Sequence, residues 1–418
     1  MKYIWNLSLK NLFRNKLRSS VSIIAIAISV CVVVMLRGLI MGMIDSMVSL
    51  ELQYSSGHIK VIDKEYESKE RLLSLQHPVD GFNGEGAGKM EQELTDIQGV
   101  ERVLSRLKFG AAATVDGEMV SMMAMGVQPE DEIAFTNVEN NITNGRMVEM
   151  GKTEIALGTR LLVKINKNVG DSVTILFTDS FGSFRGYTFN IVGEIESGLK
   201  LLDEKVMYLP LDTAQNILDM PGMATELLLV TENYRDVKSY LPNVRKVFDE
   251  NGASEEYLVQ PWQEVNPMIS MLTVAKHIYN IIYVMLIFLA CFVVINTMVM
   301  IIKERTKEIG MMTALGLKSR DILYMFIMEG TVMGVFGSLL GVILGGIGNK
   351  ILSEVGLNYA AALSDMDAEF LFKPIIYPVF TYENLIFSFI LGVIITAIAC
   401  IIPARRAAEL EPTDALRQ

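Results

Sequence analysis

The sequence predicts a membrane α-helical protein with four transmembrane helices and a large α+β extracytoplasmic domain inserted between helices 1 and 2. Of the 418 residues, 51% are hydrophobic and 20% are charged. This is too apolar for an ordinary soluble protein and too charged for a chain that lies wholly in a bilayer. Four apolar runs reach the ~18 residues that a membrane-crossing helix needs. A polar interval between the first two runs is long enough to hold its own core.

The apolar runs set the order of the segments. Within the polar interval, short alternating stretches separated by glycine turns predict strands, while Leu94, Ile97 and Val100 have helical spacing within 91–107. The expected order is a cytoplasmic amphipathic helix (1–18), transmembrane helix 1 (19–45), a periplasmic α+β domain (46–272), transmembrane helix 2 (273–302), a cytoplasmic coupling segment (303–321), transmembrane helix 3 (322–352), a periplasmic loop (353–383), transmembrane helix 4 (384–402) and a cytoplasmic tail (403–418).

The charged residues orient the chain. Basic residues concentrate before the first span, between spans two and three, and in the tail, so these segments face the cytoplasm by the positive-inside rule. The interval 46–270 instead has 35 acidic and 20 basic residues, which argues against nucleic-acid binding because that requires a basic surface. Cys31, Cys291 and Cys400 all fall inside predicted spans, so no disulfide framework is expected in the external domain.

The stretch Asn296–Leu317 carries the strongest functional signal. An apolar run ends at Ile302, a charged helix-favouring segment follows at once, Gly316 predicts a helix stop, and Ser319 predicts the cap of the next apolar helix. A membrane helix would therefore leave the bilayer, break and return, which is the shape that docks a membrane subunit on a soluble motor. The charges alone fit equally well a cluster that only anchors topology.

The whole string resembles the ERTREIG-x-x-x-ALG signature after the second transmembrane helix in permeases of the MacB/FtsX superfamily of ABC transporters. The tail Pro403–Arg417 resembles the C-terminal signature of the same superfamily, and the chain is identified as a member most like the lipoprotein-releasing LolC/LolE-type permeases. The resemblance implies that this segment contacts the ATPase. The implied coupling residues are Glu304, Arg305, Thr306, Lys307, Glu308, Ile309, Gly310, Ala314, Leu315 and Gly316.

The chain shows no nucleotide or metal motif of its own. Gly88 and Lys89 come nearest to a P-loop, but that motif needs glycine where Asn83 stands and Ser or Thr where Met90 stands. The three histidines lack metal-ligand spacing. We therefore expect a membrane subunit that is not itself an enzyme and binds no cofactor, with ATP and Mg on a separate partner ATPase.

The resemblance implies two alternative functions. One is a permease subunit that uses ATP hydrolysis by the partner ATPase to release lipoproteins from the inner membrane toward the outer membrane. The other is a MacB-like mechanotransmission permease that drives efflux or secretion of small molecules or peptides. A membrane-anchored scaffold is a third reading, but it would leave the coupling motif unused. The implied partners are the ABC ATPase subunit, a second permease (the same chain or a paralogue), lipoprotein cargo, membrane lipids and a periplasmic carrier. The implied location is the inner membrane, multi-pass, with the large domain in the periplasm.

Two further sites are predicted for carrier and cargo. Lol-type permeases that recruit the carrier have a protruding loop, and the corresponding hairpin here, 177–187, is short but has Phe181 and Phe184 at its tip. Adaptable apolar side chains at the outer ends of spans one and two suit a cavity for acyl chains, although simple packing explains them as well. The residues of this predicted cavity are Met35, Leu39, Met43, Ile278, Ile282 and Met285.

The third span has two unusual features. Glu329 lies about seven residues inside it; a carboxylate in a membrane is a functional candidate by default, but it could also be an interfacial residue paired with Lys318 or Arg320. A stripe of glycines along the same span predicts close helix packing, either within the subunit or across a dimer.

Overall fold

The computed structural model describes residues 16–115, 117–358 and 375–410. The chain divides into two compact units. The membrane unit consists of Met1–Asp45, Leu272–Tyr359 and Ile375–Gln418, and the external unit of Ser46–Met271 and Ala360–Pro374. Nearly all of the amphipathic helix predicted over 1–18, about half of the loop predicted over 353–383 and the end of the predicted tail lie outside the described residues.

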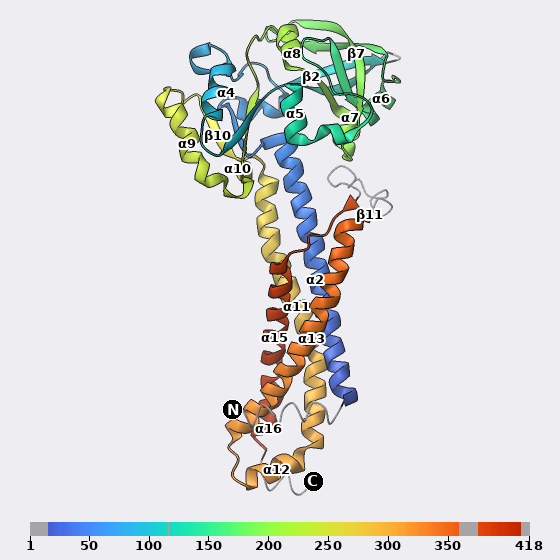
Figure 1. The fold of residues 1–418 in the computed structure, drawn as a ribbon, viewed down its shortest axis with the longest axis vertical. Helices are drawn as coiled ribbons and strands as arrows, with labels where there is room; N and C mark the ends of the chain where they lie inside the picture. Colours follow the sequence, from blue (N-terminus) through green and yellow to red (C-terminus); the bar gives the residue numbers. More distant parts are fainter. Residues whose placement is uncertain (1–15, 116, 359–374, 411–418) are drawn as a thin grey trace. The chain divides into compact units, whose positions relative to one another are not determined.

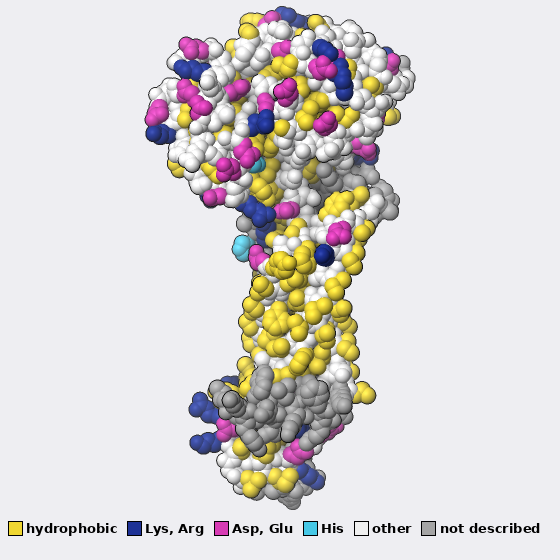
Figure 2. Space-filling view, viewed as in Figure 1, with side chains coloured by type: hydrophobic (Ala, Val, Ile, Leu, Met, Phe, Trp, Pro, Cys, Tyr) yellow, Lys and Arg dark blue, Asp and Glu magenta, His cyan; other side chains and the backbone are white. Residues whose placement is uncertain are grey.

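The membrane unit is built on four long helices that are apolar enough to cross a bilayer (Figure 1). Hydrophobic side chains cover their surface between charged ends (Figure 2). The predicted four-helix membrane fold is therefore confirmed. The long helices are α2 (Lys16–Glu51), α11 (Pro267–Glu304), α13 (Ser319–Val355) and α15 (Tyr382–Ala399), and the shorter elements are α12 (Thr306–Ala314), α16 (Ile401–Ala408), β11 (Leu357–Asn358) and β12 (Ile375–Ile376).

The glycine stripe of α13 packs within the subunit. A Cβ atom on Gly341 would lie 2.6 Å from the carbonyl oxygen of Ala27 in α2, and one on Gly334 would lie 3.0 Å from the Cβ atom of Thr396 in α15. Neither approach leaves room for a larger side chain. The stripe therefore lets α13 contact α2 on one side and α15 on the other, as small residues do between membrane helices.

The external unit contains a ten-stranded sheet. Its order is β10-β1-β9-β2-β3-β8-β5-β7-β4, and β6 pairs with both β2 and β7. The strands are β1 (Ile59–Asp63), β2 (Val100–Val115), β3 (Glu118–Val127), β4 (Ile142–Gly145), β5 (Glu154–Gly158), β6 (Ser172–Thr178), β7 (Phe184–Ile195), β8 (Val206–Pro210), β9 (Glu226–Thr231) and β10 (Tyr257–Pro261).

The pairings close six of these strands into a ring, in the order β2-β3-β8-β5-β7-β6 and back to β2. Alternate residues on each strand face one hydrophobic core, which includes Phe109, Ile175 and Phe189. The period of two follows from the pleat, because successive side chains point to opposite faces. The helices packed with this core are α6 (Thr159–Lys164) and α8 (Leu211–Leu218).

Of the other four strands, β4 pairs with β7, and β10, β1 and β9 extend the sheet beyond β2. The core under β10, β1 and β9 includes Leu94, Leu229 and Phe248. Helices α4 (Ala87–Thr95) and α9 (Val237–Glu250) contribute to this core. The remaining elements of the external unit are the π-helix η1 (Leu52–Ser56), α3 (Tyr66–Lys69), η2 (Glu70–Leu72), η3 (Phe82–Gly84), α5 (Pro129–Thr136), η4 (Val138–Asn141), α7 (Lys200–Lys205), η5 (Tyr234–Asp236) and α10 (Trp262–Val265).

The helical pattern read over 91–107 was only partly right. The helix ends at Thr95 and β2 begins at Val100. Gly99 lies between them with φ +88, and a Cβ atom there would lie 2.3 Å from a ring carbon of Tyr240. A positive φ at this glycine ends any continuing helix, because L side chains avoid that region.

A network of buried charges lies across the sheet. Glu226 of β9 forms ion pairs with Lys60 of β1 at 3.1 Å and with Lys108 of β2 at 2.6 Å. On β2, Arg106 pairs with Glu132 of α5 at 2.7 Å. All five side chains are buried. Burial alone would raise the pKa of Glu226, but Lys108, Lys60 and Arg106 lower it to about 2.

This network predicts a pH dependence of stability. The pKa of Glu226 is lower in the folded chain than its ordinary value of 4.5, so the folded state binds fewer protons than the unfolded state. Its contribution is therefore fully present above about pH 4.5 and is lost as the pH falls toward 2. We expect the midpoint of urea unfolding, followed by fluorescence, to drop over this window. Glu226→Gln should be less stable at pH 7, with a flatter dependence between pH 5 and 2. An unchanged slope would contradict the assignment.

Candidate functional site

The coupling segment is a short helix between two backbone breaks. Helix α11 ends at Glu304, α12 starts at Thr306, and α13 starts at Ser319. The hydroxyl of Thr306 donates to the carbonyl oxygens of Ile302 at 3.1 Å and Lys303 at 2.9 Å, which keeps the first break compact. At the second break Gly316 has φ +95. The sequence predicted the second break but not the first.

The residues of the segment divide into a buried set and an exposed set. Ile309 belongs to the core of the membrane unit together with Ala404 and Ala407 of α16, so the two cytoplasmic sequence signatures pack in one cluster. On the opposite side, Leu315 is 88% exposed and Met311, one turn earlier, is 51% exposed. The buried set is Arg305, Thr306, Ile309 and Gly310; Glu308 is half-buried; the exposed set is Glu304, Lys307, Met311, Ala314, Leu315 and Gly316. Helix α12 is thus held from one side and presents an apolar tip on the other.

A buried ion pair connects the coupling segment to the third span. Nη1 of Arg305 lies 3.8 Å from Oε2 of Glu329 in α13, and Nε of Arg305 lies 3.2 Å from Oε2 of Glu308. Arg305 and Glu329 are both buried. The expected pairing of Glu329 with Lys318 or Arg320 is therefore replaced by one with Arg305, because the break at Arg305 turns its side chain toward α13.

An open cavity of about 520 Å³ lies beside the coupling helix. Arg320 at the start of α13 and Arg405 of α16 line it together with Thr313, Glu409 and Leu410. This cavity gives the cytoplasmic end of the unit a concave surface that carries two arginines and one glutamate among uncharged residues. The sequence did not indicate it, because its walls come from three separate helices.

The hairpin predicted for carrier docking is short and fixed at its turn. The carboxylate of Asp179 accepts from the backbone N–H groups of Phe181 at 3.0 Å and Ser183 at 2.8 Å, and pairs with Arg185 at 2.6 Å. Phe181 is 77% exposed and Phe184 is 68% exposed. The turn therefore exposes two aromatic rings on a backbone that hydrogen bonds fix in place. Their role in docking stays a prediction.

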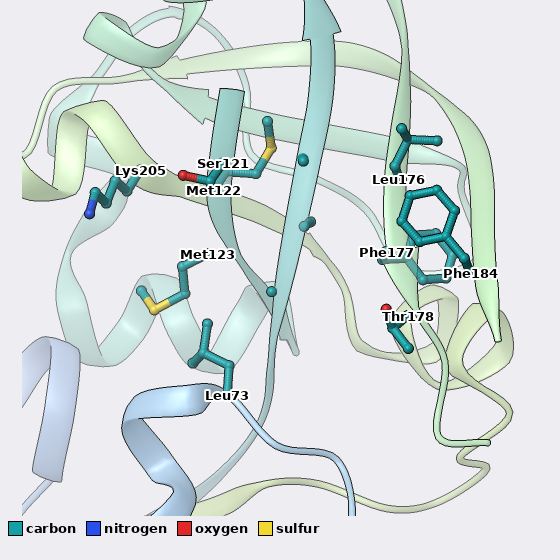
Figure 3. A pocket seen from close by; sticks show the side chains of 12 residues that line it. Leu73, Ser121, Met122, Met123, Leu176, Phe177, Thr178, Phe184 and Lys205 are labelled. Atoms are coloured by element: carbon teal, nitrogen blue, oxygen red, sulfur yellow. The ribbon is translucent and has the colours of Figure 1, made fainter. Parts of the chain in front are cut away.

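An apolar groove of about 420 Å³ runs along the outer surface of the strand ring, next to this hairpin (Figure 3). Small residues of β2, Gly110 and Ala112, form part of its lining and leave the space. The larger lining side chains are Leu73, Met122, Met123, Leu176, Phe177 and Phe184, with Lys205 among the polar ones. The groove and the hairpin share Phe184, so they form one continuous surface.

The residues of the predicted cargo cavity lie on two helices. Met35 of α2 packs against α13, because a Cβ atom on Gly348 would lie 3.5 Å from its sulfur. Leu39 and Met43 are half-buried. On α11, Ile278, Ile282 and Met285 are exposed. The cavity stays a prediction.

Comparison with known proteins defines the family. The model of the MacB-like periplasmic core domain matches residues 19–241, and that of the FtsX-like permease C-terminal matches residues 280–412. The lipoprotein-releasing system transmembrane protein LolC of Xylella fastidiosa (strain Temecula1) is 25% identical over 330 residues, which is 74% of this chain and 77% of LolC. LolE of Haemophilus influenzae is 23% identical over 338 residues, covering 78% of this chain and 79% of LolE. The macrolide export ATP-binding/permease protein MacB of Bdellovibrio bacteriovorus is 33% identical over 124 residues, covering 30% of this chain and 16% of MacB.

Four membrane helices with an α+β domain inserted after the first span, together with the two family matches, define an ABC-transporter permease. This chain belongs to the MacB/FtsX superfamily of such permeases and is most like its LolC/LolE members. It is a multi-pass protein of the inner membrane with a large periplasmic domain.

Proposed function

We propose that the chain is the permease subunit of a transporter that releases lipoproteins from the inner membrane toward the outer membrane, driven by ATP and Mg bound to a separate ATPase. The observation that carries the proposal is the coupling helix, which is packed on one face and exposes Met311 and Leu315 on the other. The length of the match to LolC and LolE supports the choice of cargo. The chain itself supplies binding and transmission rather than catalysis.

In this proposal ATP-driven closure of the ATPase moves α12. The motion passes to α13 through Arg305 and Glu329, and to α11 through the hydrogen bonds of Thr306. Helix α2 runs without interruption from Lys16 to Glu51, so the first span continues as one helix into residues of the external unit. Such helices transmit displacement because their backbone hydrogen bonds keep them stiff.

A MacB-like permease that drives efflux or secretion is the second candidate. The match of residues 19–241 to the MacB-like periplasmic core favours it, as does the short turn of the hairpin at 179–183. In that case the external unit would act on a partner protein instead of on lipid-anchored cargo.

Depletion of the chain separates the two candidates. We expect mature acylated lipoproteins to accumulate in the inner membrane when membranes are fractionated and blotted after depletion. Re-expression of the wild-type chain is the control and should restore their distribution. If lipoproteins stay in the outer membrane while sensitivity to antibiotics or secreted peptides changes, the lipoprotein proposal fails and the MacB-like candidate stands.

A further inference from the structure

The helix that continues from the first span ends against the sheet in an unusual way. After Glu51 the backbone widens into the π-helix η1, which closes with a bond from the N–H of Gly57 to the carbonyl oxygen of Leu52 at 3.0 Å. The next amide, His58, leaves the helix and donates to Leu229 of β9 at 2.9 Å. The carbonyl oxygens of Gln53 and Tyr54 are therefore among the last acceptors of a helix, which have no donors within that helix.

Two cations of β2 supply the missing donors. Nη2 of Arg106 donates to the carbonyl oxygen of Gln53 at 2.6 Å, and Nζ of Lys108 donates to that of Tyr54 at 3.4 Å. Both side chains are buried. A positive charge at a helix C-terminus also interacts favourably with the negative end of the helix dipole. The end of the helix is thus held by charge as well as by hydrogen bonds.

The two cations are themselves fixed in the sheet. The carboxylate of Glu132 accepts from Nε and Nη2 of Arg106 at 3.0 and 2.7 Å, while Lys108 and Lys60 both pair with Glu226. Each cation therefore has a carboxylate partner in addition to the carbonyl of the helix, and neither is free to follow that helix alone. An apolar contact could slide, whereas a displaced buried cation would lose its partners, which is costly.

We propose that Arg106 and Lys108 form a joint that fastens the end of the first-span helix to the sheet, so that displacement of this helix is delivered to β2 and through it to the strand ring. This inference rests on the proposed function, because it assigns these positioning residues to the transmission step. The return chain is tied to the same place, since the side chain of Asn266 donates to the carboxylate of Glu51 at 2.9 Å. The π-helix fits this role, because such turns are frequent at functional sites.

The test removes the Arg106 half of the joint together with its carboxylate partner, so that the substitution leaves neither of these two charges unpaired. The double variant Arg106→Met/Glu132→Met replaces the whole pair with apolar side chains, a change that folded proteins often tolerate. The matched control is Arg146→Met/Glu154→Met, which removes another ion pair of the same domain, with bonds of 2.9 and 2.7 Å. Each variant is assembled with the ATPase in lipid nanodiscs, and both ATP hydrolysis and lipoprotein release are measured.

We expect the joint variant to hydrolyse ATP at the wild-type rate but to release about tenfold less lipoprotein per ATP, a size typical of a lost coupling interaction. The control variant should keep both rates. If Arg106 served stability only, lipoprotein release would instead fall in each variant in step with the decrease of its melting temperature. Wild-type release by the joint variant would overturn the proposal.

Two further measurements keep the test decisive. If the double variant does not fold, Arg106→Lys takes its place, because lysine keeps the charge beside Glu132 but lacks the fork that holds Glu132 and Gln53 together; its release per ATP should also fall. Hydrogen exchange of the full complex gives a readout without cargo: ATP should change exchange in β2 of the wild type and the control, but not of the joint variant. If the wild-type complex releases no lipoprotein yet shows this exchange pattern, the proposed function fails and the joint stands. Equal exchange changes in all three would reject the joint.

Discussion

Replacing Leu315 with aspartate is expected to abolish stable binding of the ATPase subunit. Leu315 is the most exposed apolar side chain of the coupling segment, at the end of a helix whose other face is packed. An apolar tip of this kind is stabilised by burial in a partner, whereas a carboxylate there would be desolvated without compensation. A central interface residue of this type contributes about 2 kcal/mol or more, so binding should weaken by ~30-fold or more. The measurement is co-purification of the ATPase with the tagged permease.

Leu72→Asp is the matched control for this variant. Leu72 is 80% exposed, almost as much as Leu315, but it belongs to the external unit. The same change of side chain there should leave the ATPase bound. If Leu315→Asp retained a normal amount of ATPase, α12 would not be the docking element, and the cavity lined by Arg320 and Arg405 would become the next candidate.

Removing the carboxylate of Glu329 is expected to give the largest loss of stability in the membrane unit. Glu329→Ala leaves the buried guanidinium of Arg305 without the carboxylate that faces it at 3.8 Å. Breaking a buried pair from one side costs about 3–5 kcal/mol. We expect a lower yield, a lower melting temperature in detergent and loss of ATPase stimulation by the permease.

The double variant Arg305→Met/Glu329→Met shows whether this loss comes from the pair. Because neither charge remains, most of the stability should return, and the double-mutant cycle closed with the single variants Arg305→Met and Glu329→Met should give a coupling energy well above the error of the measurement. ATPase stimulation should stay low, since the link between α12 and α13 is still missing. Simple addition of the two single losses would show that Arg305 and Glu329 act independently.

The membrane part of the fold could be predicted from sequence because the signal is local. A run of apolar residues must be a helix in a bilayer, where every backbone polar group needs a partner within the segment. The break at Gly316 was predicted because its signal is also local: the positive φ depends on the glycine itself. The turn at Arg305 was missed, because nothing in the side chains around it forbids a continuing helix.

Contacts between distant segments could not be predicted. Glu329 was expected to pair with a nearby basic residue, yet its partner Arg305 comes from the preceding helix, beyond the break. Likewise Arg106 and Lys108 alternate with apolar residues on β2 and look like the solvated face of a strand. They are buried because η1 and Glu226, which come from other parts of the chain, contact them. Such pairs depend on tertiary packing, which single-residue patterns do not contain.

The first and last strands of the external unit, β1 and β10, are neighbours, with Ile59 opposite Pro261. Residues 59–261 therefore begin and end next to each other. A module with adjacent ends can be inserted into a host, removed or replaced with little disturbance of either part. One set of membrane spans could thus be combined with different external domains, and chimeric permeases cut before β1 and after β10 are a practical route to exchanging this domain without rebuilding the spans.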